Sequence, residues 1–541
     1  MTVAREPRAA LLAVSLLLVV AGAYAQAPTA DFHLDDSALI LHNPVVTSLD
    51  VSAAWLGDLW SGISVPSPYY RPLVVLSFML DRVLFGENPA GYHVHNVLWH
   101  LAAVGLLQGL CLRRLGASRA LVAGLIFGLH PIQSEAVLWI SARNDLMCAA
   151  GVFGGLWVAD ARPRAWGVLL VACVGLAALS KEVGLLFPVY LLLWRLLWRE
   201  RPARSEILLA GGAAATCLAA RWGMIDAVGA LREPFPTHST WEIVSHATLL
   251  TVSWLTLPWP LTSAASVFTR IASPFVLAGA VTAAIGVAWL CRAAPLRNGL
   301  LLACAVLAWV PSVVGSLNTG LVGERYLYLS VAFVAIAVAA SAAGRVALLA
   351  AGAVALVWLA LLGIRVAEWE SGATLVAAAV ARQPDAVSWA MYARQSQRDG
   401  HTREAFRGYR MATETDPPYV RECAEPVRML LESGAYEPAR RIAHDNLLPR
   451  GCDRNRDFAV ERLRAEVLAG RFDQASQTLG LFSRGLRRKE YALNAAVCAE
   501  KGDLTCVASF ALDEPGGAAA LQVDVFDLLH PPRPPAVAVT P

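Results

Sequence analysis

Long apolar segments separated by short polar ones fill the chain as far as about residue 366. Because a helix needs roughly 20 apolar residues to cross a bilayer, several of these segments are short for a straight span. The pattern predicts an all-α polytopic membrane domain, residues 1–366, with about 11 spans. The expected spans lie near residues 9–25, 94–112, 119–131, 146–160, 165–180, 183–198, 205–222, 274–291, 298–315, 326–344 and 346–366.

Clusters of arginine between the spans set the expected topology. With a cytoplasmic N-terminus, every cluster falls in a cytoplasmic turn, as the positive-inside rule requires. The run 9–25 ends in a small-residue site and could be a cleaved signal peptide. We expect an uncleaved first span instead, since the polar loop after it would otherwise lose its anchor. The apolar stretches 72–86 and 246–261 are expected to be interfacial or re-entrant, and counting the second as a span would invert all that follows.

A change of composition after residue 366 marks a second region. In residues 367–520 glycines recur at positions 400, 434, 470 and 502, with spacings of 34, 36 and 32 residues, and alanine follows each of the first three five residues later. This period is typical of tetratricopeptide repeats. We expect a short α-solenoid that presents an extended peptide or a partner protein, although it could also only cover or dimerise the membrane domain. Residues 521–541 form a Pro-rich tail.

Composition narrows the function classes. Hydrophobic residues make up 56% of the chain and charged residues 16%, with a net charge of +3, which is typical of an integral membrane protein and gives no reason to expect nucleic-acid binding. The sequence has no glycine-rich nucleotide motif and no Cys/His zinc pattern. Cys423, Cys452, Cys498 and Cys506 in the repeat region permit disulfides, with three connectivities open.

The polar loop after the first span carries the strongest candidate chemistry. Asp35 and Asp36 stand side by side just beyond a membrane span, where a carboxylate pair can act as a general base or hold a divalent cation. The alternative is an Asx-rich turn that caps a short helix starting near Ser37.

Other polar residues gather on the same predicted outer face, which suggests one shared site. His93, Asn96 and His100 share a helix face, but helix–helix hydrogen bonding is a better account of them than metal binding. Lys181 and Glu182 could form a neutralised pair between helix ends. Alternatively Lys181, Arg143 or Arg325 could bind a phosphate.

Six motifs, taken in the order in which they occur along the chain, resemble those of one known family. The segments DFHLDDSALILHNPVV, YYRPL, GYHVHNVLWH, HPIQSEAVLWISARNDL, SKEVGLLFP and GERYLYLS are similar to those of the transmembrane and tetratricopeptide-repeat O-mannosyltransferases, members of the GT-C glycosyltransferase group. The resemblance covers roughly residues 25–420 and weakens between about 223 and 273.

The resemblance implies a GT-C fold and an inverting transfer of a sugar from a polyprenyl-phosphate donor to protein Ser/Thr hydroxyls on the non-cytoplasmic face. It places the catalytic base at Asp35, with Asp36 beside it. No metal or other cofactor is required, although the two aspartates could hold a divalent cation. The matched positions expected to line the donor and acceptor cavity are Tyr70, Arg71, His93, Asn96, His130, Glu135, Arg143, Lys181, Glu324 and Arg325.

Alternatives remain for substrate and activity. The implied sugar is mannose, but a bacterial source would use an undecaprenyl lipid and could use another sugar. A GT-C relative that modifies a lipid or a cell-envelope glycan, and a non-enzymatic repeat scaffold, both fit the same pattern. In each case we expect a multi-pass protein of a bacterial inner membrane with its repeats in the periplasm.

Overall fold

The computed structural model describes residues 7–63, 67, 69–224, 239–262, 265–266, 274–319, 321–342, 344–415, 423–450, 452 and 456–479. It divides into two compact units, Met1–Arg382 and Gln383–Pro541. Several predicted features lie outside the described residues: the tail 521–541, the fourth repeat glycine at 502, and Cys498 with Cys506.

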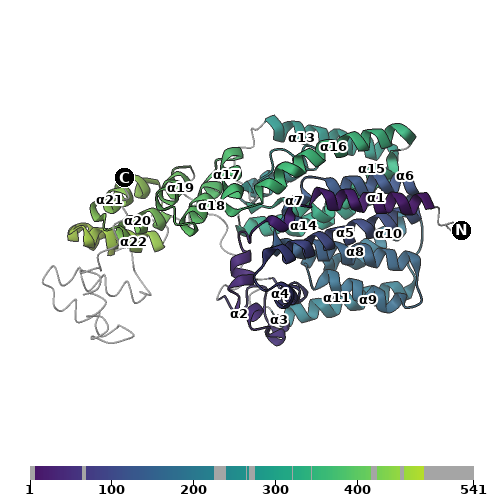
Figure 1. Cartoon of the computed structure of the whole chain (residues 1–541), viewed down its shortest axis with the longest axis horizontal. Helices are drawn as coiled ribbons and strands as arrows, with labels where there is room; N and C mark the ends of the chain where they lie inside the picture. Colours follow the sequence, from purple (N-terminus) through teal and green to yellow (C-terminus); the bar gives the residue numbers. More distant parts are fainter. Residues whose placement is uncertain are drawn as a thin grey trace. The chain divides into compact units, whose positions relative to one another are not determined.

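The first unit is built almost entirely from helices, which Figure 1 labels. Its long helices are α1 (Pro7–Ala23), α5 (Pro89–Leu115), α6 (Ala117–Leu129), α8 (Arg143–Ala161), α9 (Trp166–Ala178), α10 (Phe187–Leu197), α11 (Arg204–Met224), α12 (Thr240–Trp254), α13 (Pro274–Ala293), α14 (Pro295–Thr319), α15 (Tyr328–Ser341) and α16 (Gly344–Glu368). Shorter elements are η1 (Ala27–Thr29), η2 (Ser37–Leu41), α2 (Pro44–Thr47), α3 (Val51–Leu56), α4 (Pro72–Phe85), α7 (Gln133–Leu138), η3 (Ile140–Ala142), η4 (Glu182–Leu186), η5 (Glu324–Leu327) and α17 (Gly372–Arg382).

The apolar pattern located these helices correctly. Each of the eleven predicted segments coincides with one helix, and seven helices of the described residues are long and apolar enough to cross a membrane. The prediction of an all-α, multi-span membrane protein is therefore confirmed. Helices α6, α8, α9 and α10 are shorter or more polar, while α4 and α12, which cover the stretches expected to be interfacial, are not among the seven.

Close helix packing organises the bundle. Helix α5 packs against α6 and α8, and α8 packs against α9 (Figure 1). At Gly151 of α8 an added Cβ would lie 2.6 Å from the backbone nitrogen of Ala177, so only glycine allows this approach to α9. Gly184 meets the backbone carbonyl of Ala177 in the same way. Gly151 thus allows α8 to pack closely on α9, and Gly184 seats η4, which follows Lys181, against the same helix.

Two loop contacts close the polar end of the bundle. A two-residue strand β1 (Ala265–Ser266) pairs antiparallel with β2 (Leu321–Val322), so that Ala265 lies opposite Val322. The end of α16 meets the loop after α1, where the Asp31 N–H donates to the Glu370 carbonyl at 3.1 Å. Both contacts place chain segments far apart in sequence at the same end.

The second unit contains three helix pairs among its described residues. They are α18 (Ala386–Arg398) with α19 (Thr402–Thr415), α20 (Ala424–Glu432) with α21 (Tyr436–Arg441), and α22 (Arg456–Leu468) with α23 (Phe472–Leu479). Two short turns, η8 (Ile442–Leu447) and η9 (Leu448–Arg450), follow α21.

The repeat spacing has a physical cause in these pairs. Gly400, Gly434 and Gly470 all adopt a positive φ, between 71° and 77°, in the turn between paired helices, a conformation that favours glycine. The alanines five residues later are fully buried. A disulfide joins Cys423 to Cys452, one of the pairings that the sequence left open. The tetratricopeptide assignment itself stays a prediction.

The boundary between the units follows α17 and not α16. Leu375 of α17 belongs to the core of the membrane unit, and Arg382 at its end forms an ion pair with Glu368. The amphipathic composition that begins at residue 367 thus starts before the membrane unit ends.

Candidate functional site

The loop after α1 folds inward at Asp36. Leu34, two residues earlier, has a φ of 50°, a left-handed conformation that is uncommon for a branched residue. The Asp36 carboxylate is completely buried and accepts hydrogen bonds from the His33 N–H at 3.0 Å, from the Ser141 N–H at 2.8 Å and from the Ser141 hydroxyl. Burial raises the pKa of Asp36 to about 7, although these hydrogen bonds act in the opposite direction.

The two aspartates have different environments. Asp36 occupies the position before η2, which begins at Ser37 as expected, but its side chain does not cap that helix. Asp35 is only partly buried, and its backbone carbonyl accepts from the Leu39 N–H at 2.8 Å. All three groups that donate hydrogen bonds to Asp36 belong to the protein, and Asp36 is buried. Asp35, which is only partly buried, is therefore the aspartate of the pair that retains access to solvent.

The predicted polar residues of α5 hold this loop and its neighbours in place. The His93 ring contacts the Asp31 carbonyl at 3.1 Å. Asn96 donates to the carbonyls of Val137, Trp139 and Ile140, the segment that leads into η3 and Ser141. These contacts are the hydrogen bonding between elements that the sequence favoured over metal binding.

Arg143 is sequestered. Its side chain is fully buried, with an ion pair to Asp81 at 2.5 Å and a hydrogen bond to the Asn96 side-chain oxygen at 2.7 Å. It also donates to Ser77 and to the Tyr92 carbonyl. With its donors satisfied inside the bundle, Arg143 holds α4, α5 and α8 together.

Four other cationic side chains, two of them buried and two partly exposed, form a group that is hereafter called the cation cluster. It consists of Arg71, Lys181, Arg221 and Arg325. Arg71 makes a two-pronged contact with Glu182, at 3.2 and 2.8 Å, and Arg221 reaches the same carboxylate at 3.0 Å. Burial alone would raise the pKa of Glu182, but the two arginines outweigh it and lower that pKa to about 2.

The ring of Tyr326 connects the rest of the cation cluster. The Lys181 ammonium lies 5.8 Å from the centre of this ring and pairs with Asp145. The Arg325 guanidinium lies 5.0 Å from the same ring and 4.4 Å from the ring of Trp139, and it pairs with Glu135. The four cations thus pair with three carboxylates, those of Glu182, Asp145 and Glu135.

Sequence neighbours in this region do not pair with each other. The neutralised pair considered for Lys181 and Glu182 does not form, because Lys181 pairs with Asp145 and Glu182 with two arginines. Likewise Glu324 pairs with Arg365 at 2.9 Å, whereas the adjacent Arg325 pairs with Glu135.

The short segment from Trp139 to Ser141 links the two halves of the site. Trp139 stacks under Arg325, and two residues later Ser141 holds Asp36. The structure therefore brings the aspartate loop close to the cation cluster through one backbone segment, which Asn96 fixes.

Two predicted site residues have local packing roles. The Tyr70 hydroxyl donates to the Trp55 carbonyl at 3.0 Å, and the buried His130 ring contacts the Leu255 carbonyl at 3.4 Å. Within the described ranges, no group of three or more His, Cys, Asp or Glu side chains could hold a metal ion. Asp36 in particular has its oxygens engaged by protein donors.

The sequence missed Arg221, Ser141 and Tyr326 as site residues. Arg221 did carry a signal, because it is a lone arginine at the outer end of a span, contrary to the positive-inside rule. Ser141 carries none, since a serine that binds a distant carboxylate looks like any other.

Comparison with known proteins supports the motif resemblance. No protein-family model matches the chain. The chain is 38% identical over 129 residues to protein O-mannosyl-transferase tmtc2 of Xenopus laevis, which is 23% of this chain and 15% of that protein. It is 34% identical over 177 residues to protein O-mannosyl-transferase TMTC2 of Homo sapiens, 30% and 21% respectively, and 37% identical over 172 residues to protein O-mannosyl-transferase Tmtc1 of Drosophila melanogaster, 30% and 20%.

These matches confirm the similarity that the motifs indicated. They span only 15% to 21% of those three relatives' own length. Among solved structures, ArnT from Cupriavidus metallidurans bound to undecaprenyl phosphate aligns with a TM-score of 0.39 and 15% identity, over 88% of this chain and 81% of that one. Because this TM-score is low, nothing further is inferred from that likeness.

Proposed function

We propose that this chain is a GT-C membrane glycosyltransferase that moves a sugar, mannose by analogy with the named relatives, from a polyprenyl-phosphate donor to a protein Ser/Thr hydroxyl. One observation carries the proposal: Asp35, which is partly exposed, belongs to a loop that η3 joins to a cluster of four cations. A base on one side and phosphate-binding cations on the other are what such a transfer needs.

The reaction breaks the bond between the sugar C1 and the phosphate oxygen and forms a bond from C1 to the acceptor hydroxyl oxygen. Asp35 takes the hydroxyl proton, and the polyprenyl phosphate leaves with the bonding electrons. The motif resemblance implies inversion at C1. No metal ion is needed for this charge balance, because the cations neutralise the departing phosphate.

Asp36 acts in this proposal as a positioning residue. Its three hydrogen bonds fix the backbone next to Asp35, so the base is held in one orientation.

The donor phosphate is assigned to the cation cluster and not to Arg143. Arg143 is fully buried and paired with Asp81, whereas Arg221 and Arg325 keep 20% and 21% of their side-chain surface exposed. Each cation of the cluster contacts a carboxylate that orients it, and guanidinium and ammonium groups are the side chains that bind phosphate best.

Two observations support a location of the helix pairs on the same side of the membrane as Asp35. The His33 ring contacts the Trp369 carbonyl at 2.6 Å, so the chain leaves α16 at the end where the aspartate loop lies. The Cys423–Cys452 disulfide is suited to an oxidising compartment such as a periplasm. The helix pairs would there present the acceptor segment or a partner protein.

Transfer of labelled sugar tests the proposal. Isolated membranes containing the full chain would receive polyprenyl-phosphate mannose labelled in the sugar, and label would be followed separately in protein, lipid and glycan fractions. Label in protein that is lost in Asp35→Asn, with insertion unchanged, supports the proposal. Label only in lipid or glycan would show a different acceptor, and transfer that is equal in both proteins would overturn Asp35 as the base.

A further inference from the structure

Two arginines converge at the end of the bundle opposite the aspartate loop. The Arg119 side chain donates to the Ala342 carbonyl at 3.4 Å, and Arg297 donates to the hydroxyl of the adjacent Ser341 at 3.2 Å. Because Ser341 and Ala342 are neighbours in the chain, the two arginine side chains reach the same turn. Helix α5, about 40 Å long at 1.5 Å per residue, separates this end from His93 and the aspartate loop.

Neither arginine forms an ion pair with a carboxylate among the described residues. Arg297 has a neutral partner in Asn298, at 3.3 Å. Arginines elsewhere at this end behave differently. Arg114 pairs with Asp160 and Glu200, and Arg195 with Asp160 and Glu206. Two neighbouring guanidinium groups without a counter-charge call for an anion from outside the chain.

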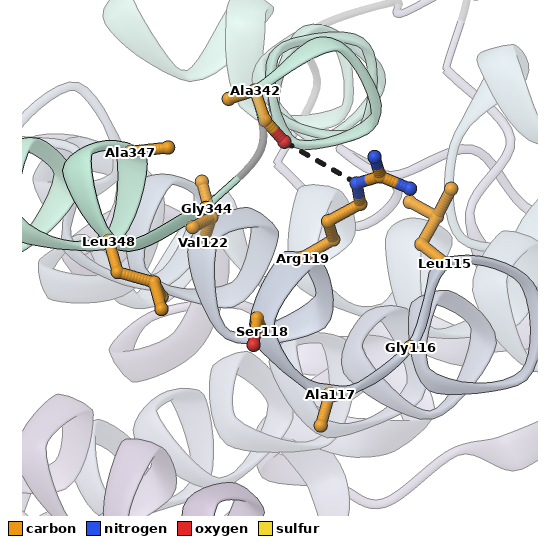
Figure 2. Close-up of a pocket in the computed structure, with 10 residues that line it drawn as sticks. All are labelled: Leu115, Gly116, Ala117, Ser118, Arg119, Val122, Ala342, Gly344, Ala347 and Leu348. Atoms are coloured by element: carbon orange, nitrogen blue, oxygen red, sulfur yellow. Dashed lines mark hydrogen bonds between the residues drawn. The ribbon is translucent and has the colours of Figure 1, made fainter.

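A cavity of about 270 Å³ lies beside Arg119. It opens between the turn from α5 to α6 and the end of α15 with the start of α16, and its lining has a polar part and an apolar part. Arg119 and Ser118 supply polar groups, while Leu115, Val122 and Leu348 supply an apolar wall. Figure 2 shows Arg119 reaching from α6 towards Ala342, with Leu348 and Val122 on the other side of the hollow.

We propose that this cavity binds the phosphate of an anionic phospholipid in the leaflet opposite the catalytic face, with Arg119, which lines the cavity, as the phosphate ligand and with Arg297, which reaches the neighbouring Ser341, adding positive charge beside it. The apolar wall suits an acyl chain or glycerol backbone, and the arginines suit a phosphodiester. The site uses no residue of the proposed catalytic face. Because its only charged lining group is an arginine, a zwitterionic headgroup gains less there than an anionic one.

Lipid titration of the purified full chain tests this site. Dioleoylphosphatidylglycerol, dioleoylphosphatidylcholine or sodium phosphate would be added to the detergent-solubilised protein, and bound lipid would be counted by native mass spectrometry alongside the thermal unfolding temperature. The expected result is preferential binding of phosphatidylglycerol, at least about tenfold weaker in the Arg119→Gln/Arg297→Gln double variant. Arg201→Gln, an exposed arginine at the same end, is the matched control and should bind as wild type.

A second variant guards against misfolding of the double variant. Ala347→Leu narrows the cavity without changing charge and should also weaken phosphatidylglycerol binding. Equal binding of the two lipids, or unchanged binding in both the double variant and Ala347→Leu, would overturn the proposal. Protection by sodium phosphate alone, with no lipid preference, would assign the arginines to a soluble phosphate and overturn the lipid source.

Discussion

Asp36 and Ser141 are joined by two hydrogen bonds across 105 residues of sequence: the backbone N–H and the hydroxyl of Ser141 both donate to one carboxylate oxygen. This contact ties the loop after the first span to the turn that precedes α8. It also gives the two adjacent aspartates different tasks, since Asp36 is satisfied by the protein and Asp35 is not enclosed.

Replacement of each aspartate by asparagine should separate these tasks. Asp35→Asn removes the proposed base, and we expect sugar transfer to fall by about 100-fold or more with little change in donor KM. Asp36→Asn keeps the shape of the side chain but weakens its hydrogen bonds with Ser141, and we expect sugar transfer to fall by about tenfold. Initial rates in membranes, normalised to inserted protein, measure both. A larger loss in Asp36→Asn than in Asp35→Asn would reverse the assignment.

The raised pKa of Asp36 predicts a pH-dependent stability. A carboxyl whose pKa is about 7 when folded binds its proton more tightly in the folded than in the unfolded state. Its stabilisation is therefore fully present below the unfolded pKa and is lost as pH rises through about 7, by at most on the order of 4 kcal/mol. Wild-type unfolding temperature should fall from about pH 4 to about pH 7, the window between the ordinary carboxyl pKa of 3.8 and the folded value.

Asp36→Asn is the control for that measurement. Its unfolding temperature should be nearly flat over the same pH range, because the titrating group is gone. An identical decline in the two proteins would show that other groups cause the pH dependence.

Arg221 offers a test of the cation cluster. Arg221→Gln removes one charge that contacts Glu182, and we expect the donor KM to rise by about tenfold while the protein remains folded. Arg201→Gln, which is exposed between α10 and α11, should leave the KM unchanged. Titration of the labelled donor in the transfer assay gives both values. A KM unaffected in Arg221→Gln would remove this arginine from the donor site.

Gly184 should tolerate no larger residue. A Cβ at Gly184 would run into the backbone carbonyl of Ala177, so Gly184→Ala must push η4 and the neighbouring Lys181 away from α9. We expect a loss of about 1–3 kcal/mol in stability together with a fall in transfer. Gly175→Ala, in the same α9 helix with nothing within 4 Å of an added Cβ, should be neutral or slightly stabilising. Thermal unfolding in detergent compares the two.

The Cys423–Cys452 disulfide predicts both a stability and a location. The double variant Cys423→Ser/Cys452→Ser should lose about 2–4 kcal/mol in the helix-pair unit, visible as faster limited proteolysis there. Cys291→Ser removes an exposed free thiol and should not alter proteolysis. In intact cells, peptides bearing Cys423 and Cys452 should resist thiol labelling before reduction. Free thiols at both positions in cells would place this unit in a reducing compartment.

The hydrophobic pattern was sufficient for the helices but not for the contacts among polar residues. A long apolar run is a local feature of the sequence, so all eleven segments could be located without a structure. The turn glycines 400, 434 and 470 were equally visible, because a positive φ favours one residue type. Which charged side chains form ion pairs depends instead on which residues, distant in the sequence, the fold brings face to face. For that reason Lys181 meets Asp145 and not its neighbour Glu182.

Arg143 illustrates the same limit. From sequence it is an arginine at the outer end of a span and a plausible phosphate ligand. Its burial against Asp81, from a stretch that seemed only interfacial, gives it a structural role. The four residues of the cation cluster look similar to Arg143 in the sequence, but their side chains are more exposed than that of Arg143. Only packing decides this difference.

The link between the end of α16 and the aspartate loop limits how this protein can be divided. His33 bonds to the Trp369 carbonyl, and Asp31 to that of Glu370, so residues usually assigned to a linker complete the first loop. Cutting the chain at the change of composition would remove those acceptors along with α17. Any exchange of the helix pairs between proteins of this kind should therefore use a junction after Arg382, where modules can be recombined without dismantling the loop that carries Asp35.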